Sequence, residues 1–168
     1  MSRSLLRAVT SAVLRSHHGV AARTCSSNQQ PPKMSKEVPD KSELKSRLTP
    51  LQWHVTQEKG TERPYTGCYN KFYEGGVYTC IVCEQELFTS DSKYDSGCGW
   101  PAFNDVLEQG RVKLTKDTTL NMVRTEVTCS KCDAHLGHVF NDGPKPKRKR
   151  FCINSASLNF HPADVKKE

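Results

Sequence analysis

The chain has 168 residues and a hydrophobic content of 35%, which leaves room for one domain and a terminal segment. No apolar stretch approaches the roughly 20 residues needed to cross a bilayer, so we expect no membrane partner. Residues 1–33 contain five cations and no acid, whereas residues 34–168 contain 20 cations and 18 acids, so most of the net charge of +7 lies at the N-terminus. This balance argues against a nucleic-acid partner, which would require a large basic face.

The first 33 residues have the composition of a mitochondrial transit peptide. They are rich in arginine and serine, and no acidic residue precedes Glu37. Five apolar residues fall roughly on one helical face, namely Leu5, Leu6, Val9, Val13 and Leu14. Arg7 interrupts the apolar run that a secretory signal would need. We therefore predict that residues 1–33 direct the protein to the mitochondrial matrix. The alternative is a disordered basic arm without a targeting role, and Met34 could start a leaderless form.

The folded domain is predicted to span residues 42–168, after a linker over residues 34–41. Ser, Asn, Gln, Pro and Lys dominate the segment that precedes the domain, which is typical of linkers. Residues 42–48 can form a short first helix. We interpret this helix and the one that follows it as packing elements without a catalytic role.

A second helix is predicted to follow Thr49. Pro50 occupies its first turn, Gln52 completes a capping box with Thr49, and Gly60 ends it. The positions expected to face inward are Leu51, Trp53 and Val55.

From residue 65 onward, the pattern is that of a mainly β protein. Short β-like runs cover residues 77–80, 123–128 and 151–160, and residues typical of turns lie between them. We therefore predict antiparallel β-sheets of β-tent or barrel-like form, with short helices at the N-terminal edge.

Two CxxC pairs predict a metal site. Cys80 and Cys83 form the first pair, Cys129 and Cys132 form the second, and 45 residues lie between them. Four thiolates paired in this way suit a tetrahedral zinc ion with no open position, which is a structural site. We expect the zinc to tie two hairpins together, so that metal binding is coupled to folding.

Two alternatives remain open for these cysteines. Each pair could form a redox-active disulfide instead. A site of two cysteines and two histidines is also compatible with the spacing, because Cys129, Cys132, His135 and His138 lie three residues apart. The second alternative would leave the first CxxC pair without partners.

Cys152 lies outside the predicted metal site and directly after a basic run. Residues 145–150 contain five cations, and nearby cations favour the thiolate form of a cysteine. Phe151 and Ile153 fit the spacing of a strand, so Cys152 should be held on a strand. The sequence therefore indicates a reactive thiol, and the alternative is a buried core cysteine.

Three further segments alternate with the CxxC pairs. They are residues 95–103 (DSGCGWPAF), 134–144 (AHLGHVFNDGP) and 150–155 (RFCINS). Taken in order with the CxxC pairs, they resemble the methionine-R-sulfoxide reductase B family from about Leu48 to Phe160. The leader makes the chain similar to the mitochondrial members. This resemblance implies an enzyme, a thiol oxidoreductase that reduces methionine-R-sulfoxide, protein-bound or free, to methionine.

The resemblance also implies how the sulfurs act. Cys152 attacks the sulfoxide and becomes a sulfenic acid. Cys98 then condenses with it to a disulfide, and thioredoxin reduces that disulfide. Gly97 and Gly99 suit a loop that swings towards Cys152. The alternative for Cys98 is an inert loop thiol.

Other site residues follow from the reaction and the resemblance. The sulfoxide oxygen must be protonated, and His138 is the first candidate for the acid, followed by His135. We expect one of these two histidines to be a satisfied core residue instead. Asn154 is expected to donate to the oxygen or to order water, and Arg150 to favour the thiolate. Two aromatic residues are expected to form the substrate pocket: the indole face of Trp100 suits the substrate methyl, and Phe151 adds a wall. Asp142 either orients a histidine or shapes a turn.

One departure from the family concerns the loop before Cys152. The family usually has a glycine two residues before the motif arginine, and Arg148 occupies that position here. The basic run itself resembles a nuclear-import or nucleic-acid patch. Beside a reactive sulfur, we interpret it as a loop that steers electronegative substrates or the reductase, with a plain solvated loop as the alternative.

Two functions without turnover compete with the reductase. One is a zinc-ribbon module that recognises a protein or nucleic acid, and the other is a chaperone-like zinc protein. The chaperone-like protein would make Cys98 and Cys152 dispensable, and the effect of Cys152→Ser on turnover would distinguish the zinc-ribbon module from the reductase. For the reductase we expect oxidised proteins and thioredoxin as partners, and a monomer.

Overall fold

Both helices begin at side-chain caps. The computed structural model describes residues 39–119 and 122–163, so the predicted leader and most of the linker lie outside the described residues. Helix α1 spans Lys41–Arg47, and the carboxylate of Asp40 accepts its first free N–H groups. Helix α2 spans Pro50–Glu58 and has the predicted capping box. It ends at the left-handed residue Lys59, one position before Gly60.

One of the inward positions predicted for α2 is wrong. Val55 is fully buried and Trp53 packs partly against the core, as expected. Leu51 is instead 49% exposed. It lies in the first turn of a helix of which only Val55 and Thr56 are buried, so its side chain faces solvent.

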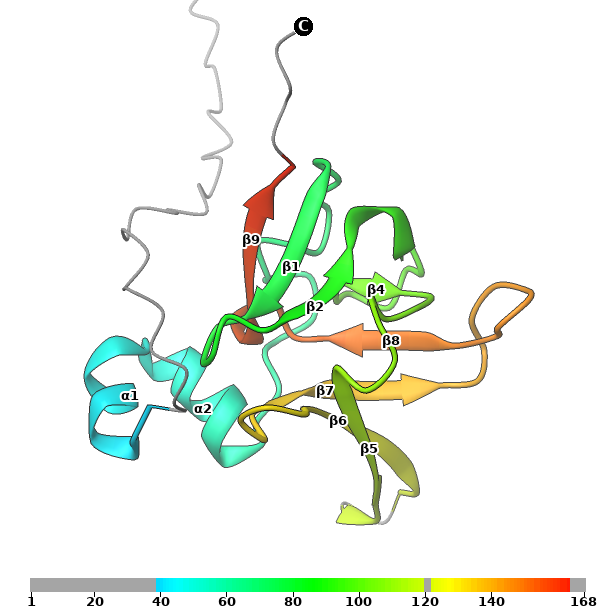
Figure 1. Ribbon diagram of the computed structural model, residues 1–168. Helices are drawn as coiled ribbons and strands as arrows, with labels where there is room; N and C mark the ends of the chain where they lie inside the picture. Colours follow the sequence, from blue (N-terminus) through cyan, green and yellow to red (C-terminus); the bar gives the residue numbers. More distant parts are fainter. Residues whose placement is uncertain (1–38, 120–121, 164–168) are drawn as a thin grey trace, which may run out of the picture.

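All strand pairs are antiparallel, and they form two sheets (Figure 1). The three-stranded sheet has the order β2-β1-β9, with β1 at Gly76–Cys80, β2 at Glu86–Thr89 and β9 at Leu158–Pro162. The six-stranded sheet has the order β3-β4-β8-β7-β6-β5. Its strands are β3 (Lys93–Tyr94), β4 (Ala102–Phe103), β5 (Val112–Asp117), β6 (Arg124–Cys129), β7 (His135–Phe140) and β8 (Arg150–Ile153). The prediction of a mainly β fold with N-terminal helices is therefore confirmed.

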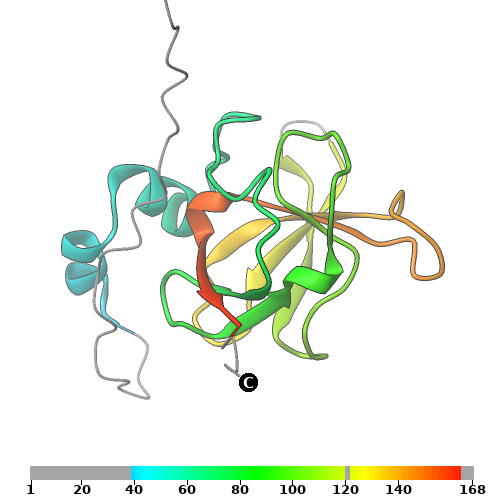
Figure 2. The ribbon, with the colours of Figure 1, turned by 90° about the horizontal axis from the view of Figure 1, so that it is seen from above.

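The predicted run over residues 151–160 is divided between the two sheets. A 3-10 turn at Ser155–Ser157 ends β8 and redirects the chain into β9. A second 3-10 turn at Ser90–Ser92 joins β2 to β3. The helices and the β7–β8 loop lie at opposite ends of the molecule, both in the view of Figure 1 and from above in Figure 2.

The strand register places the core residue Phe151 and the candidate site residue Cys152 on opposite faces of β8. Phe151 pairs with Phe103 and Val139, whereas Cys152 pairs with Ala102 and His138. Because side chains alternate along a strand, Phe151 points into the core and Cys152 to the opposite face. The rings of Phe88 and Phe103 stack in that core with centroids 4.4 Å apart. Among the described residues, no helix is long and apolar enough to span a membrane.

Candidate active site and metal site

The sulfurs of Cys98 and Cys152 lie in contact although 54 positions separate them in the chain. Their Sγ atoms are 3.3 Å apart, well beyond the roughly 2.05 Å of a disulfide bond, and both cysteines are free. Cys152 is on β8, as predicted, and the hydroxyl of Ser96 donates to Cys98 Sγ at 3.0 Å. Two sulfurs at this separation can form a disulfide after a small movement.

The glycines around Cys98 allow a tight loop that is held in place. Gly97 and Gly99 have φ values of 70° and 92°, which glycine adopts without steric cost. Tyr65 closes the loop, since its N–H donates to Gly99 O and its hydroxyl to Gly97 O, both at 2.7 Å. A Cβ on Gly99 would lie 2.7 Å from the Cβ of Pro64. The loop therefore holds Cys98 beside Cys152 already, without the expected swing.

The two thiols are coupled through one proton. The hydrogen bond from Cys152 is the main cause that lowers the pKa of Cys98 to about 5. The same hydrogen bond, together with burial, raises the pKa of Cys152, and Arg150 opposes that rise. Interacting sites of this kind titrate as a pair. The contact therefore favours loss of the first proton from the pair and retention of the second between the two sulfurs.

Arg150 is fixed by Asp142 next to the sulfur pair. Its Nε and a terminal nitrogen donate to the two carboxylate oxygens at 2.8 and 2.7 Å, a bidentate pair. The guanidinium also lies 4.4 Å from the ring centroid of Phe140. Asp142 thus orients Arg150, whereas the two histidines have other carboxylate partners.

His138 lies opposite Cys152 in the strand register, and Asp117 binds its ring. Nε2 of His138 is 2.8 Å from Asp117 Oδ2. The same carboxylate accepts hydrogen bonds from the hydroxyl and N–H of Thr119 and from Arg124. The bonds from Thr119, and then that from His138, lower the pKa of Asp117. An ionised carboxylate can only accept at this contact, which favours a proton on Nε2 of His138.

His135 is a buried, paired histidine. Its side chain is 2% exposed, and its Nδ1 is 2.8 Å from Glu126 Oε1. Lys59 Nζ binds the other oxygen of Glu126 at 2.9 Å. Burial lowers the pKa of His135, which favours the neutral ring. His135 thus fits the expected burial, but it is not fully satisfied, because its buried Nε2 has no hydrogen-bond partner among the described residues. Its ring centroid lies 5.4 Å from that of His138.

Asn154 and Trp100 are both tied to Glu62. Asn154 is buried, its Oδ1 accepts the N–H of Glu62 at 3.0 Å, and its Nδ2 donates to Leu136 O at 2.9 Å. An amide has two such hydrogens, so one is committed to Leu136. The indole of Trp100 donates to the carbonyl of Glu62 at 3.0 Å.

Glu62 and Asp117 were not found by sequence reasoning. The buried carboxylate of Glu62 accepts the N–H groups of Ser155 and Ala156 at 2.7 and 2.9 Å, and burial raises its pKa. Neither residue belongs to a motif, and their contacts span 93 and 21 positions. No local signal in the sequence could have identified them.

Phe151 is not a wall of the site, which corrects the expectation for this residue. Its side chain is 6% exposed and belongs to the hydrophobic core, where its ring centroid is 5.8 Å from that of Phe88. The alternation along β8 directs neighbouring side chains to opposite faces, so Cys152 and Phe151 cannot share one pocket.

The four cysteines of the CxxC pairs converge at one point. Their Sγ atoms lie within 4.8 Å of one another, with Cys80–Cys132 and Cys83–Cys129 each at 3.6 Å. A tetrahedral zinc with Zn–S bonds of 2.3 Å would separate its ligands by roughly 3.8 Å, so the cluster fits a tetrathiolate. None of the four is disulfide-bonded, and His135 and His138 bind carboxylates. The cluster could therefore hold a metal ion between the β1–β2 and β6–β7 turns.

A cleft of about 390 Å³ borders the sulfur pair at Cys98. Its lining combines polar and aromatic groups, namely Tyr94, Ser96, Cys98, Asp142, Pro144 and Arg150. A polypeptide that reaches the sulfur pair through this cleft would pass the start of the β7–β8 loop.

Comparison with known proteins places this site in a family. Residues 48–162 match the model of the SelR domain. Methionine-R-sulfoxide reductase B1 of Drosophila melanogaster is 60% identical over 144 residues, which cover 79% of this chain and 69% of the fly protein. The mitochondrial methionine-R-sulfoxide reductase B3 of Mus musculus is 52% identical over 148 residues, covering 86% of this chain and 58% of the mouse protein.

A bacterial relative is covered almost completely. The peptide methionine sulfoxide reductase MsrB of Hahella chejuensis is 53% identical over 131 residues, which cover 78% of this chain and 94% of the bacterial protein. Among solved structures, the Yippee-like domain of Mis18 matches 54% of this chain with 19% identity and a TM-score of 0.44, a similarity too low to bear on function.

Proposed function

The chain belongs to the methionine-R-sulfoxide reductase B family of oxidoreductases, and we propose that it reduces methionine-R-sulfoxide in proteins through Cys152 and Cys98. The observation that supports this most is the contact of the two sulfurs at 3.3 Å, in a pair that shares no residue with the four-cysteine cluster. A protein-binding or chaperone-like module without turnover has no need for such a pair.

The first step creates the nucleophile within the pair. The thiol proton of Cys152 passes to the Cys98 thiolate, which leaves Cys152 as the thiolate. Arg150, fixed by Asp142, stabilises that charge and opposes the rise in the pKa of Cys152. Cys98 can therefore act as a local base, but Arg150 also favours the Cys152 thiolate, so a single turnover does not require Cys98.

In the second step, oxygen is transferred to Cys152. The thiolate attacks the sulfoxide sulfur while the oxygen takes a proton through His138 or a water that His138 orients. Methionine leaves and Cys152 becomes a sulfenic acid, so the substrate gains the two electrons that Cys152 loses. Trp100 offers its indole face to the substrate methyl, and the second amide hydrogen of Asn154 is a donor for the oxygen.

In the third step, the pair forms a disulfide. The Cys98 thiol attacks the sulfenic sulfur, its proton joins the departing hydroxide, and water leaves. A dithiol reductant, which we propose is thioredoxin, then returns two electrons by thiol–disulfide exchange.

Replacing Cys98 by serine tests the resolving step. We expect Cys98→Ser to form about one equivalent of methionine per protein, because Cys152 remains, but to lose most thioredoxin-supported turnover. Mass spectrometry after one equivalent of substrate should show a Cys98–Cys152 disulfide in the wild type and sulfenic acid on Cys152 in the variant. Full thioredoxin-supported turnover of the variant would assign resolution to another thiol.

Asp117 is proposed as the residue that positions His138. If the carboxylate selects the Nε2–H tautomer, Asp117→Asn should lower kcat by about tenfold to hundredfold while KM changes little. The ¹⁵N spectrum of the His138 ring should change from one tautomer to a mixture. The exposed Asp91 supplies the control, since Asp91→Asn should alter neither quantity. An unchanged kcat in Asp117→Asn would reduce Asp117 to a structural role.

Two further assignments complete the proposal. Cys80, Cys83, Cys129 and Cys132 would hold zinc, which supplies a closed structural clamp and no chemistry when bound. We also propose a mitochondrial location, supported by the composition of residues 1–33 and by the similarity to the mitochondrial B3 reductase of mouse.

A further inference from the structure

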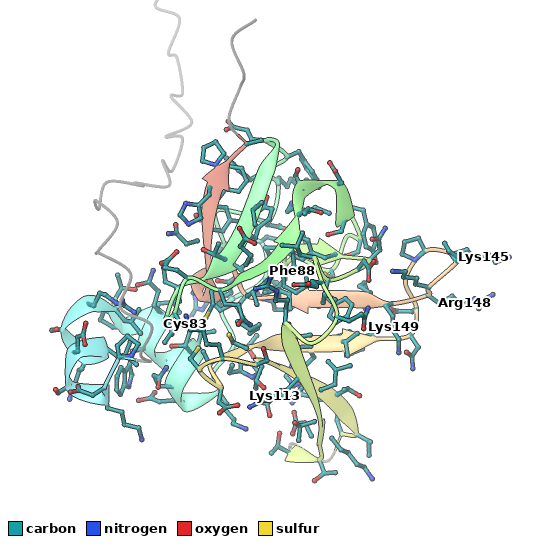
Figure 3. All side chains as sticks on the ribbon, viewed as in Figure 1. Cys83, Phe88, Lys113, Lys145, Arg148 and Lys149 are labelled. Atoms are coloured by element: carbon teal, nitrogen blue, oxygen red, sulfur yellow. The ribbon has the colours of Figure 1, made fainter. Side chains whose placement is uncertain are left out.

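The cations of the β7–β8 loop are only partly paired with acids among the described residues. We call residues 144–149 the basic loop; all six are exposed, and Figure 3 shows Lys145, Arg148 and Lys149 at this end of the molecule. Within residues 39–119 and 122–163, Lys147 is the one cation of this loop that has an acidic partner, Asp105. Lys149 donates to the neutral Asn141 at 2.7 Å, and no described acid binds Lys145 or Arg148. Three cations are therefore available to a partner.

The basic loop is folded rather than merely solvated. Arg148 N donates to Pro144 O at 2.9 Å, Gly143 N donates to Arg148 O at 3.2 Å, and the Lys147–Asp105 pair attaches the loop to the chain after β4. Arg148 has a φ of 53°, a left-handed conformation that glycine adopts freely and an arginine does not. The backbone conformation at residue 148 therefore does not favour an arginine. A strained conformation that is kept in the fold indicates that the side chain has a function.

The base of the loop borders the cleft that reaches the sulfur pair. Its first residue, Pro144, lines the cleft together with Cys98 and Arg150. Arg148 and Lys149 precede Cys152 by four and three positions. An extended peptide advances about 3.3 Å per residue, so side chains a few positions from a bound methionine sulfoxide would reach the loop.

We infer that the basic loop is a docking surface for acidic segments of oxidised polypeptides, with Asp or Glu a few residues from the methionine sulfoxide. This inference rests on the proposed function. The sulfoxide itself is neutral, so the groups that bind it cannot distinguish its neighbours in the chain. The cations of the basic loop can distinguish acidic from neutral neighbours of the methionine sulfoxide. They would also raise the association rate of acidic substrates.

The test compares two peptides with a central methionine-R-sulfoxide, flanked by Glu in one and Gln in the other. Dithiothreitol serves as reductant, which removes thioredoxin from the assay. We expect the full-length protein to prefer the Glu peptide about tenfold in kcat/KM at low salt, and the preference to fall at about 0.5 M salt. Equal kcat/KM for the two peptides would overturn the inference.

Matched variants locate the effect. Lys145→Glu/Lys149→Glu should abolish or reverse the preference, whereas Lys41→Glu/Lys45→Glu on α1, with the same change in net charge, should keep it. Arg148→Gly should raise the thermal midpoint and lower the preference about threefold, because it removes both the strain and a cation. If the loop variant keeps the peptide preference but raises the KM for thioredoxin, the surface serves the reductase and the inference is wrong.

A small substrate separates this inference from the function itself. N-acetyl-methionine-R-sulfoxide does not reach the loop, so its reduction should be equal in the wild type and both charge variants. If the wild type reduces it but shows no peptide preference, only the docking surface is refuted. If the wild type reduces neither N-acetyl-methionine-R-sulfoxide nor the two peptides, both the proposed function and the docking surface are refuted.

Discussion

Replacing Cys152 by serine should abolish reduction of a methionine-R-sulfoxide peptide, with kcat/KM reduced by at least about 1000-fold. A serine hydroxyl cannot be oxidised to the equivalent of a sulfenic acid, so the reaction has no first intermediate. Cys98 cannot substitute for it, because Cys98 lies on the glycine loop and not opposite His138 in the strand register. Turnover with dithiothreitol as reductant measures the effect without a requirement for thioredoxin.

The variant must be shown to be folded. Serine fills nearly the volume of cysteine, and Cys152 belongs neither to the hydrophobic core nor to the four-cysteine cluster. We therefore expect Cys152→Ser to keep its bound metal and its thermal midpoint. Cys98→Ser is the matched control from the same sulfur pair, because it should still yield one equivalent of methionine. Turnover of Cys152→Ser at the wild-type rate would exclude Cys152 as the nucleophile.

Removing the metal should unfold the domain. The cluster joins the β1–β2 turn, in the three-stranded sheet, to the β6–β7 turn, in the six-stranded sheet. Structural zinc contributes about 10–16 kcal/mol in zinc-finger peptides, whereas small domains are stable by only about 5–15 kcal/mol. Either chelation or Cys129→Ser should therefore abolish the cooperative thermal transition. Circular dichroism and elemental analysis would measure the fold and the metal together.

A neighbouring exposed residue provides the control for the metal prediction. Lys131 lies in the same turn as Cys129 and Cys132, and its amine donates to Cys83 O at a long 3.4 Å. Lys131→Ala should keep one metal ion per chain and a wild-type transition. Elemental analysis also identifies the ion, for which zinc is the expected result. A folded, metal-free Cys129→Ser protein would refute the structural role.

Several features could be predicted because they depend on residues close together in the chain. The capping box of α2 involves Thr49 and Gln52, and it formed as the spacing indicates. Each CxxC pair is a local turn, in which the N–H of the following residue bonds back to the first cysteine carbonyl. The place of Cys152 on a strand followed from the alternation of its neighbours. The geometry of these elements depends on the spacing of residues that are close in the chain, so they can be predicted without knowledge of the fold.

The face to which a side chain points was harder to predict. Phe151 and Cys152 are adjacent and were both assigned to the site, but strand alternation sends one to the core and one to the opposite face. Leu51 was placed inward and is half exposed. In each case the sequence shows an apolar residue, while the packing partner that decides its direction comes from a distant element.

By itself, the sequence determined the mainly β class and the two CxxC pairs, because both rest on residue types at fixed spacings. The two cysteines that we propose as reactive came from the resemblance to the family. Only the tertiary structure decided which carboxylate binds which residue: Asp117 holds His138, Glu126 holds His135, and Asp142 holds Arg150. It also showed that the left-handed backbone at residue 148 carries an arginine. The physical reason is that strand register, which no short motif records, sets contacts between residues far apart in the chain.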